Sequence, residues 1–155
     1  MDLPVTPENQ KQQQAVDPLL LDQQLCFPIY SLSRKITQRY QPLLKTLGLT
    51  YPQYLVMLVL WESSSVPVSH ICERLMLDTG TVTPLLKRME KQGLIARQRD
   101  DKDERRVMVT LTESGRALRA DAETVPQQLL CEASISAEEV LSMRRVLNQW
   151  LQKFG

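Results

Sequence analysis

The chain has 155 residues, of which 43% are hydrophobic, so it is long enough to bury one core and is expected to form one domain or two very small ones. Its net charge of +1 does not suggest a uniformly basic protein. Its three scattered cysteines and single histidine argue against a disulfide framework, a metal site or a cofactor. The polar start does not resemble a signal peptide, and the longest apolar run is too short to cross a membrane. A cytoplasmic protein is therefore expected.

The N-terminal part predicts a tail followed by a long helix. Residues 1–16 are polar and are expected to be flexible. Asp17-Pro18 has the pattern of a helix start, and a helix is predicted over 17–48. Pro28 conflicts with that start, because proline lacks the N–H that a helix interior uses. A regular helix that begins near Cys26 is therefore the alternative.

Three shorter helices are expected next. The first begins at the cap Thr50 and ends near Glu62, before a loop at 63–67, and the second covers 68–76. The third opens at Asp78-Thr79 and reaches residue 92. Its inward face consists of apolar residues at helical spacing, which are Val82, Leu85, Leu86 and Met89.

A charged hairpin and two more helices complete the pattern. Strands are predicted at 94–99 and 107–111, and the turn between them is too charged to be buried. Its acids are expected to pair with Arg105 or Arg106. A helix is predicted from the cap Thr112 to about residue 130, and 136–139 form a capping box for the last helix. That helix repeats apolar residues at a spacing that predicts a seam for another helix, namely Val140, Met143, Leu147, Trp150 and Phe154.

The charge is concentrated in the middle of the chain. Residues 84–99 carry five basic residues and one acid, a net +4, whereas residues 1–26 carry −3. Over 66–111 the order is helix, turn, helix and charged hairpin, which is typical of a winged helix-turn-helix that binds double-stranded DNA. The expected fold is mostly α, with a two-stranded β wing.

The helix that opens at Thr79 is predicted to be the recognition helix. Threonine, lysine and arginine at its exposed positions can contact bases or phosphates, and the wing can place a basic side chain in the minor groove. Each pattern alone also suits a helical hairpin or a solvated turn, but their order, spacing and charge together favour DNA binding. The predicted DNA-binding residues are Thr79, Thr81, Thr83, Lys87 and Arg88 in the helix, and Arg97, Arg99, Lys102, Arg105 and Arg106 in the wing.

A second candidate site is a cysteine with tyrosines at set distances. Cys26 is followed by Tyr30, Tyr40 and Tyr51. A thiolate attacks a peroxide, hydroxyl donors stabilise it, and an apolar surround admits an organic peroxide better than a hydrated one. A lone cysteine on an apolar helix is more often inert packing, so both interpretations stay open. Cys72 is expected to belong to the core.

Four segments resemble the MarR family of dimeric winged-helix regulators. They are 84–90 (PLLKRME), 93–95 (GLI), 103–106 (DERR) and 111–115 (LTESG). The resemblance implies one MarR-type domain at 17–155, with dimerisation helices at 17–48 and 113–155 and a winged helix-turn-helix at 50–112. It also implies a homodimer on a pseudo-palindromic operator.

Cys26 with the three tyrosines, and the run 49–54 (LTYPQY), resembles the branch of this family that senses organic hydroperoxides, the OhrR-type repressors. The resemblance implies that Cys26 is the peroxidatic cysteine and that Tyr30, Tyr40 and Tyr51 support its thiolate, partly from the other subunit. It further implies that Cys131 is the resolving cysteine, and that an intersubunit disulfide between the two releases operator DNA.

Two rival functions stay open. One is a regulator of the same family that a small aromatic ligand releases from DNA, with the cysteines incidental. The other is a thiol peroxidase, against which the basic recognition helix and the absence of a Pro-x-x-x-Thr-x-x-Cys run both argue. The sequence therefore favours a DNA-binding repressor, with no enzymatic activity and no membrane association.

Overall fold

The computed structural model describes residues 17–155, so the predicted flexible tail at 1–16 lies outside the described residues. The chain divides into two units, of which the first ends at Ile36 and the second covers Thr37–Gly155. Helix α1 (Cys26–Lys45) continues across this boundary. The core and every strand described below belong to the second unit.

The first unit begins irregularly. A short 3-10 helix, η1 (Leu21–Gln23), precedes α1, whose first residue is Cys26. A helix start at Asp17 is therefore wrong, and the alternative start near Cys26 is confirmed. Pro28 explains the position, because it lies in the first turn of α1, where its missing N–H leaves no helical hydrogen bond unmade.

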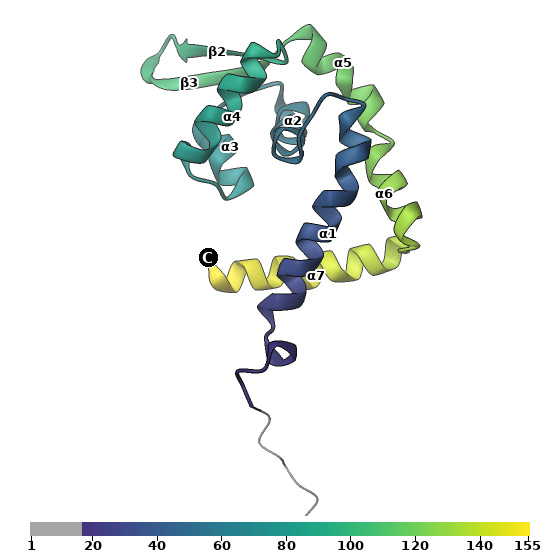
Figure 1. Cartoon of the computed structure of the whole chain (residues 1–155). Coiled ribbons are helices and arrows are strands. Elements are labelled where there is room, and N and C mark those ends of the chain that lie inside the picture. Colours follow the sequence, from purple (N-terminus) through teal and green to yellow (C-terminus); the bar gives the residue numbers. More distant parts are fainter. Residues whose placement is uncertain (1–16) are drawn as a thin grey trace, which may run out of the picture. The chain divides into compact units, whose positions relative to one another are not determined.

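The second unit is a winged helix-turn-helix followed by three helices (Figure 1). After α1 the order is α2 (Tyr51–Ser63), β1 (Ser65–Pro67), α3 (Val68–Leu75), α4 (Thr79–Lys91), β2 (Ile95–Asp100), β3 (Asp103–Leu111), α5 (Glu113–Ala122), α6 (Val125–Ala133) and α7 (Ala137–Phe154). The antiparallel sheet has the order β1-β3-β2. Strand β1 pairs with the end of β3, so the segment predicted as a loop adds a third strand.

The hairpin is longer than its apolar pattern predicts. The expected turn at 100–106 is too long, because β3 already begins at Asp103 and Asp100 is paired with it. Backbone pairing continues beyond the last apolar residues, into a part of β3 where four successive side chains are exposed. A strand with both faces in water has no alternation of apolar and polar residues, so this pattern cannot predict the outer part of the hairpin.

Helix α2 lies at the centre of the core. Thr50 and Gln53 form its capping box, in which the Thr50 N–H donates to Gln53 Oε1 at 2.9 Å. The residues that α2 buries are Gln53, Tyr54, Val56, Met57, Val59 and Leu60. The predicted inward face of α4 is confirmed, since all four of its apolar residues are buried in the same core.

The single helix predicted from Thr112 to about residue 130 is wrong, because α5 ends at Ala122 and α6 begins at Val125. Pro126 stands in the first turn of α6. Proline is tolerated there, but in a continuous helix its ring would collide with the carbonyl of residue i−4, which is Ala122, and its missing N–H would leave that carbonyl without its partner. The chain therefore ends α5 at Ala122 and starts a new helix.

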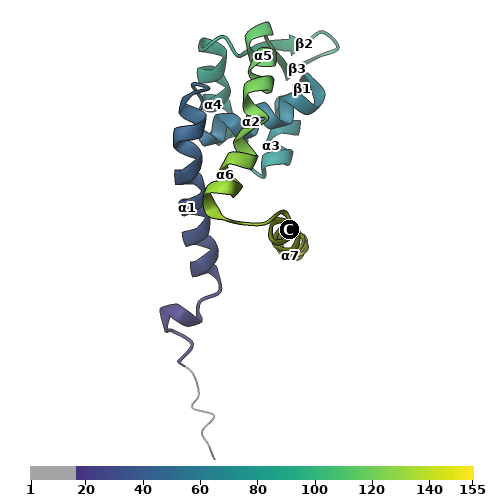
Figure 2. The ribbon, with the colours of Figure 1, turned by 90° about the vertical axis from the view of Figure 1, so that its right-hand side faces the viewer.

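Helix α7 has no buried residue, and its apolar stripe is uncovered. The predicted capping box is confirmed, with the Ser136 N–H donating to Glu139 Oε2 at 2.8 Å. Leu147 is 37% exposed and Phe154 85%. Figures 1 and 2 show α7 turning away from α6 and lying apart from α2, α3 and α4. An uncovered apolar stripe of this length favours a helix from a second chain as its partner. None of the helices within 17–155 is long and apolar enough to cross a membrane.

Replacing Gly115 with alanine is expected to destabilise the second unit by about 1–3 kcal/mol, the usual cost of overpacking. A Cβ at this position collides with the Leu94 carbonyl oxygen and lies 3.1 Å from Leu111 Cδ2. Urea denaturation measures the change. Ser114→Ala, on the exposed face of the same helix turn, is the control. Equal stability of the two variants contradicts the close approach.

Candidate nucleic-acid interface and thiol site

The start of helix α4 is held by Asp78. Its two carboxylate oxygens accept hydrogen bonds from the Thr81 N–H and the Thr81 hydroxyl, both at 2.8 Å. These bonds hold the pKa of Asp78 below its usual range, the Thr81 side chain contributing most. The cap uses the proton of the Thr81 hydroxyl, so its methyl group and the acceptor lone pairs of its oxygen are left for another molecule.

The outer face of α4 presents the predicted recognition residues. Thr79, Thr81, Lys87 and Arg88 are exposed, and Thr83 is half-buried. The Arg88 Nε donates to the Pro84 carbonyl of the same helix at 3.3 Å, and its guanidinium remains on the surface. Because the opposite face is fixed in the core, this row of polar side chains has one orientation with respect to the hairpin.

The hairpin carries exposed cations at its outer end, which are Arg99, Lys102, Arg105 and Arg106. The predicted pairing of the wing acids with Arg105 or Arg106 is wrong. Asp100 and Asp103 accept the backbone N–H groups of Lys102 and Arg105 instead, each at 3.0 Å. The ion pairs within residues 17–155 are Glu62–Arg74, at 2.6 Å, and Glu90–Arg97, at 2.7 Å. No ion pair within residues 17–155 neutralises the exposed wing cations, so their charge is available to another molecule.

Two of the three predicted tyrosines lie together. The rings of Tyr40 and Tyr51 are 5.0 Å apart, and both also pack on Tyr54, at 5.8 and 6.5 Å. Tyr54 continues the contact to Trp61 at 6.3 Å. Tyr30 lies in the first unit, 61% exposed, where the Arg34 guanidinium stacks on its ring at 5.5 Å.

Burial changes the acidity of this cluster. Burial, together with the neighbouring Tyr54 and Tyr51, raises the pKa of Tyr40 to about 12. Burial also raises the pKa of Tyr51 and of Tyr54. All three hydroxyls therefore carry their protons at neutral pH and can donate hydrogen bonds to an anion.

Gln53 and Tyr54, which the sequence marked only as members of the run 49–54, extend this cluster and connect it to helix α4. Gln53, 4% exposed, donates from Nε2 to Gln92 Oε1 at 2.8 Å, and Gln92 is the C-cap of α4. Tyr54 is the third aromatic residue of the cluster. The pattern Thr50-x-x-Gln53 signals a capping box, but its partner 39 residues away carries no local signal.

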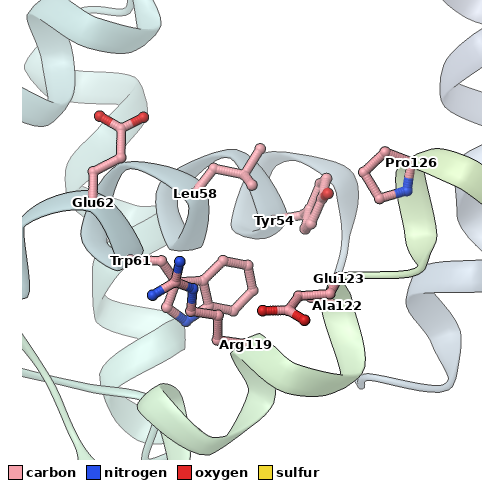
Figure 3. A pocket seen from close by; sticks show the side chains of 8 residues that line it. All are labelled: Tyr54, Leu58, Trp61, Glu62, Arg119, Ala122, Glu123 and Pro126. Carbon is pink, nitrogen blue, oxygen red and sulfur yellow. The ribbon is translucent and has the colours of Figure 1, made fainter. Parts of the chain in front are cut away.

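A groove of about 360 Å³ opens beside the tyrosines (Figure 3). Tyr54, Leu58 and Trp61 of α2 form one wall. Arg119 and Ala122 of α5 and Pro126 of α6 form the other, and Glu62 and Glu123 also line the groove. Within residues 17–155, Arg119 makes no hydrogen bond or ion pair. The charged lining of this largely apolar groove is one unpaired cation, Arg119, and two carboxylates, Glu62 and Glu123, of which Glu62 is paired with Arg74. Arg119 is therefore the group that an anion could pair with, although Glu123 places a negative charge in the same groove.

The three cysteines are free thiols. Cys26 is exposed at the first position of α1, in the first unit. Cys131 is exposed in the last turn of α6, before Ser134, whose backbone is left-handed. Cys72 is half-buried against the core, as predicted, with its sulfur 3.9 Å from the Thr79 hydroxyl. No group of residues within 17–155 could hold a metal ion.

Comparison with known proteins gives consistent matches along the chain. Residues 38–122 match the family model described as Transcriptional regulator SarA/Rot. The organic hydroperoxide resistance transcriptional regulator of Bacillus subtilis is 45% identical, over 88% of this chain and 92% of its own.

Solved structures show the same architecture. AbfR of Staphylococcus epidermidis, in its reduced form bound to DNA, is 36% identical with a TM-score of 0.71, over 86% of this chain and 94% of its own. Its disulfide form is 35% identical with a TM-score of 0.61, over 84% and 92%. A cysteine-to-serine mutant of MarR from E. coli, complexed with operator DNA, is 25% identical with a TM-score of 0.74, over 82% and 93%.

Tyr40 should make the folded chain sensitive to alkali. Its folded-state pKa, about 12, lies above the ordinary value of 10.0, so the stability it contributes is complete below pH 10 and is lost as the pH rises toward 12. Urea denaturation across this range should show the loss in the wild type and less of it in Tyr40→Phe. Identical pH profiles for the two proteins would contradict the buried environment of Tyr40.

Proposed function

The chain belongs to the MarR family of winged-helix DNA-binding transcriptional regulators, and on that premise we propose that it is a homodimeric repressor that senses organic hydroperoxides through Cys26. The observation that carries the proposal is the packed cluster of Tyr40, Tyr51 and Tyr54, whose hydroxyls stay protonated. Such donors suit a thiolate, and Cys26 is an exposed thiol of the same chain.

DNA binding uses the outer face of α4 and the end of the hairpin. In the dimer, two α4 helices enter successive major grooves about 34 Å apart on a pseudo-palindrome. Thr79, Thr81 and Thr83 face bases, and Lys87 and Arg88 face phosphates or guanine edges. The cations of the hairpin reach the minor groove or its phosphates, and they are Arg99, Lys102, Arg105 and Arg106.

The uncovered stripe of α7 supports dimerisation. Leu147 and Phe154 expose apolar surface that a monomer leaves in water. The N- and C-terminal helices of two chains then form the dimer, with 17–48 and 113–155 as the dimerising segments. The dimer fixes the distance between the two recognition helices, and a change in that distance changes the affinity for the operator.

The sensing reaction begins at the Cys26 thiolate. Its sulfur attacks the terminal oxygen of the hydroperoxide, the O–O bond breaks, and the alcohol leaves after taking up a proton. Sulfur loses two electrons and becomes a sulfenic acid. Tyr40 and Tyr51 of the partner subunit, and Tyr30 on α1, are proposed to donate hydrogen bonds to the thiolate before attack.

A disulfide completes the switch. The thiol of Cys131 of the partner subunit attacks the sulfenic sulfur, an S–S bond forms, and the hydroxyl leaves as water with the thiol proton. The bond requires Cα atoms within about 7 Å. Cys131 lies in the last turn of α6, just before the link to α7. Forming the bond therefore moves dimerisation helices, and the two α4 helices lose their register with the grooves.

A second candidate function is release from DNA by a small aromatic acid. The observation that favours it is the groove of Figure 3, where an unpaired Arg119 stands opposite Trp61. In that case the cysteines play no part. A peroxidase function gains no support, because it makes no use of the cationic face of α4.

Removing a phosphate contact should change the salt dependence of DNA binding. Lys87→Ala and Arg88→Ala are each expected to weaken binding to a duplex selected from a random pool by the wild-type protein. Each should lower the slope of log affinity against log salt by about 0.9. Fluorescence anisotropy at several salt concentrations measures both quantities. Unchanged affinity and slope in both variants would rule out this face of α4.

Organic peroxide should crosslink the dimer and release DNA. Cumene hydroperoxide followed by non-reducing electrophoresis is expected to give a covalent dimer in the wild type and in Cys72→Ser. The dimer should be lost in Cys26→Ser and in Cys131→Ser. A crosslink that survives Cys131→Ser, or peroxide release of DNA from Cys26→Ser, contradicts the mechanism. Release by salicylate from Cys26→Ser supports the aromatic-acid alternative instead.

A further inference from the structure

Glu90 and Arg97 join the recognition helix to the wing. Glu90 lies in the last turn of α4, and Arg97 is the third residue of β2. The Arg97 N–H donates to Glu90 Oε1 at 3.0 Å, and its Nε and Nη2 donate to Glu90 Oε2 at 3.0 and 2.7 Å. One carboxylate therefore holds both the backbone and the guanidinium of the same strand residue.

The pair differs from the other charged groups of this surface. The Arg97 side chain is only 23% exposed and that of Glu90 37%. Between residues 84 and 99, which the structure describes in full, the other cations form no ion pair, and they are Lys87, Arg88, Lys91 and Arg99. The single acid of this segment thus neutralises one particular arginine. The net +4 is carried by the four cations that remain.

We propose that Glu90 and Arg97 are positioning residues for DNA recognition, and that Arg97 sets the direction of the wing instead of contacting DNA. This replaces the expectation that Arg97 binds DNA. It rests on the DNA-binding part of the proposed function and not on its redox part.

A small change in the orientation of Arg97 displaces the outer end of the hairpin. The connection from α4 to β2 turns at Gly93, whose φ of 75° is left-handed, and Ile95 is the last residue of β2 in the core. Beyond Ile95 the strand is held by its pairing with β3, in which the buried Val109 lies opposite Arg97. Strand β2 continues for three residues beyond Arg97, to Asp100, a rise of about 10 Å, and the turn with Lys102 follows it. A rotation of about 10° at Arg97 then moves the end of the strand by about 2 Å, which is the H···O length of a hydrogen bond.

The two roles predict opposite effects of removing Glu90. If Arg97 contacted phosphate, removing the nearby negative charge would free it and tighten binding. If the pair positions the wing, the loss of Glu90 weakens binding despite the gain in positive charge. The effect of Glu90→Met therefore has a different sign in the two cases.

The experiment compares Glu90→Met, Arg97→Met, the double variant and Arg97→Lys with the wild type. Fluorescence anisotropy measures affinity and salt slope on a duplex selected from a random pool by the wild-type protein, and on a random duplex. Each variant is expected to bind the selected duplex about tenfold or more weakly, with little change on the random duplex. The double variant, whose net charge is unchanged, should keep the wild-type salt slope.

Lys87→Met is the matched control, because it removes a free cation from the same helix and should lower the slope by about 0.9. Arg97→Lys keeps the charge but not the two-point contact, so it separates geometry from charge if another variant folds poorly. Tighter binding by Glu90→Met, a slope about 0.9 lower in the double variant, or wild-type binding by Arg97→Lys would overturn the proposal. Failure of the wild type to select any duplex would instead count against the proposed function.

Discussion

The burial of α2 is the constraint from which the rest of the second unit follows. This helix buries six residues and contacts α3, α4, α5 and two strands of the sheet, so it cannot move without its neighbours. Its first turn presents Tyr51 and Tyr54. Its last turns hold α5 and α3, because the Trp61 Nε1 donates to the Gly115 carbonyl at 2.9 Å and Glu62 binds Arg74. Gln53 ties the same helix to the end of α4. Tyr51 and Tyr54 therefore share the support of α2 with the residues of α4 that are proposed to read DNA.

Local signals were sufficient for most of the helical elements. The apolar spacing of α4, the cap at Thr50 and the capping box at Ser136 each predict a helix, and the structure has those helices. The errors arose where the deciding interaction is not local. Strand β1 exists because β3 lies beside it, and the outer hairpin pairs through its backbone alone. The break at Pro126 has a local cause, because proline disrupts a helix interior. The sequence therefore contained the signal that separates α5 from α6.

The candidate site divides in the same way. The cations of α4 and of the hairpin follow from charge and periodicity. The partner of Arg97 does not, because seven residues and a turn separate Glu90 from it, and only the folded hairpin brings them together. The contact between Tyr40 and Tyr51 joins two helices, so no local pattern predicts it. The position of Tyr54 in the sequence did not indicate that it belongs to the same cluster. The roles given to Cys26 and Cys131 came from a family resemblance, because exposure and spacing alone do not distinguish a reactive thiol from an inert one.

The redox account depends on the first chemical event at one sulfur, which is reversible and separable from the disulfide that follows. Trapping of sulfenic acid with dimedone, read by mass spectrometry of Cys131→Ser protein after one equivalent of cumene hydroperoxide, isolates that event. The account predicts one adduct per chain, on Cys26, which appears at the peroxide dose that alters DNA binding. An adduct on Cys72, or release of DNA while Cys26 stays unmodified, would contradict it.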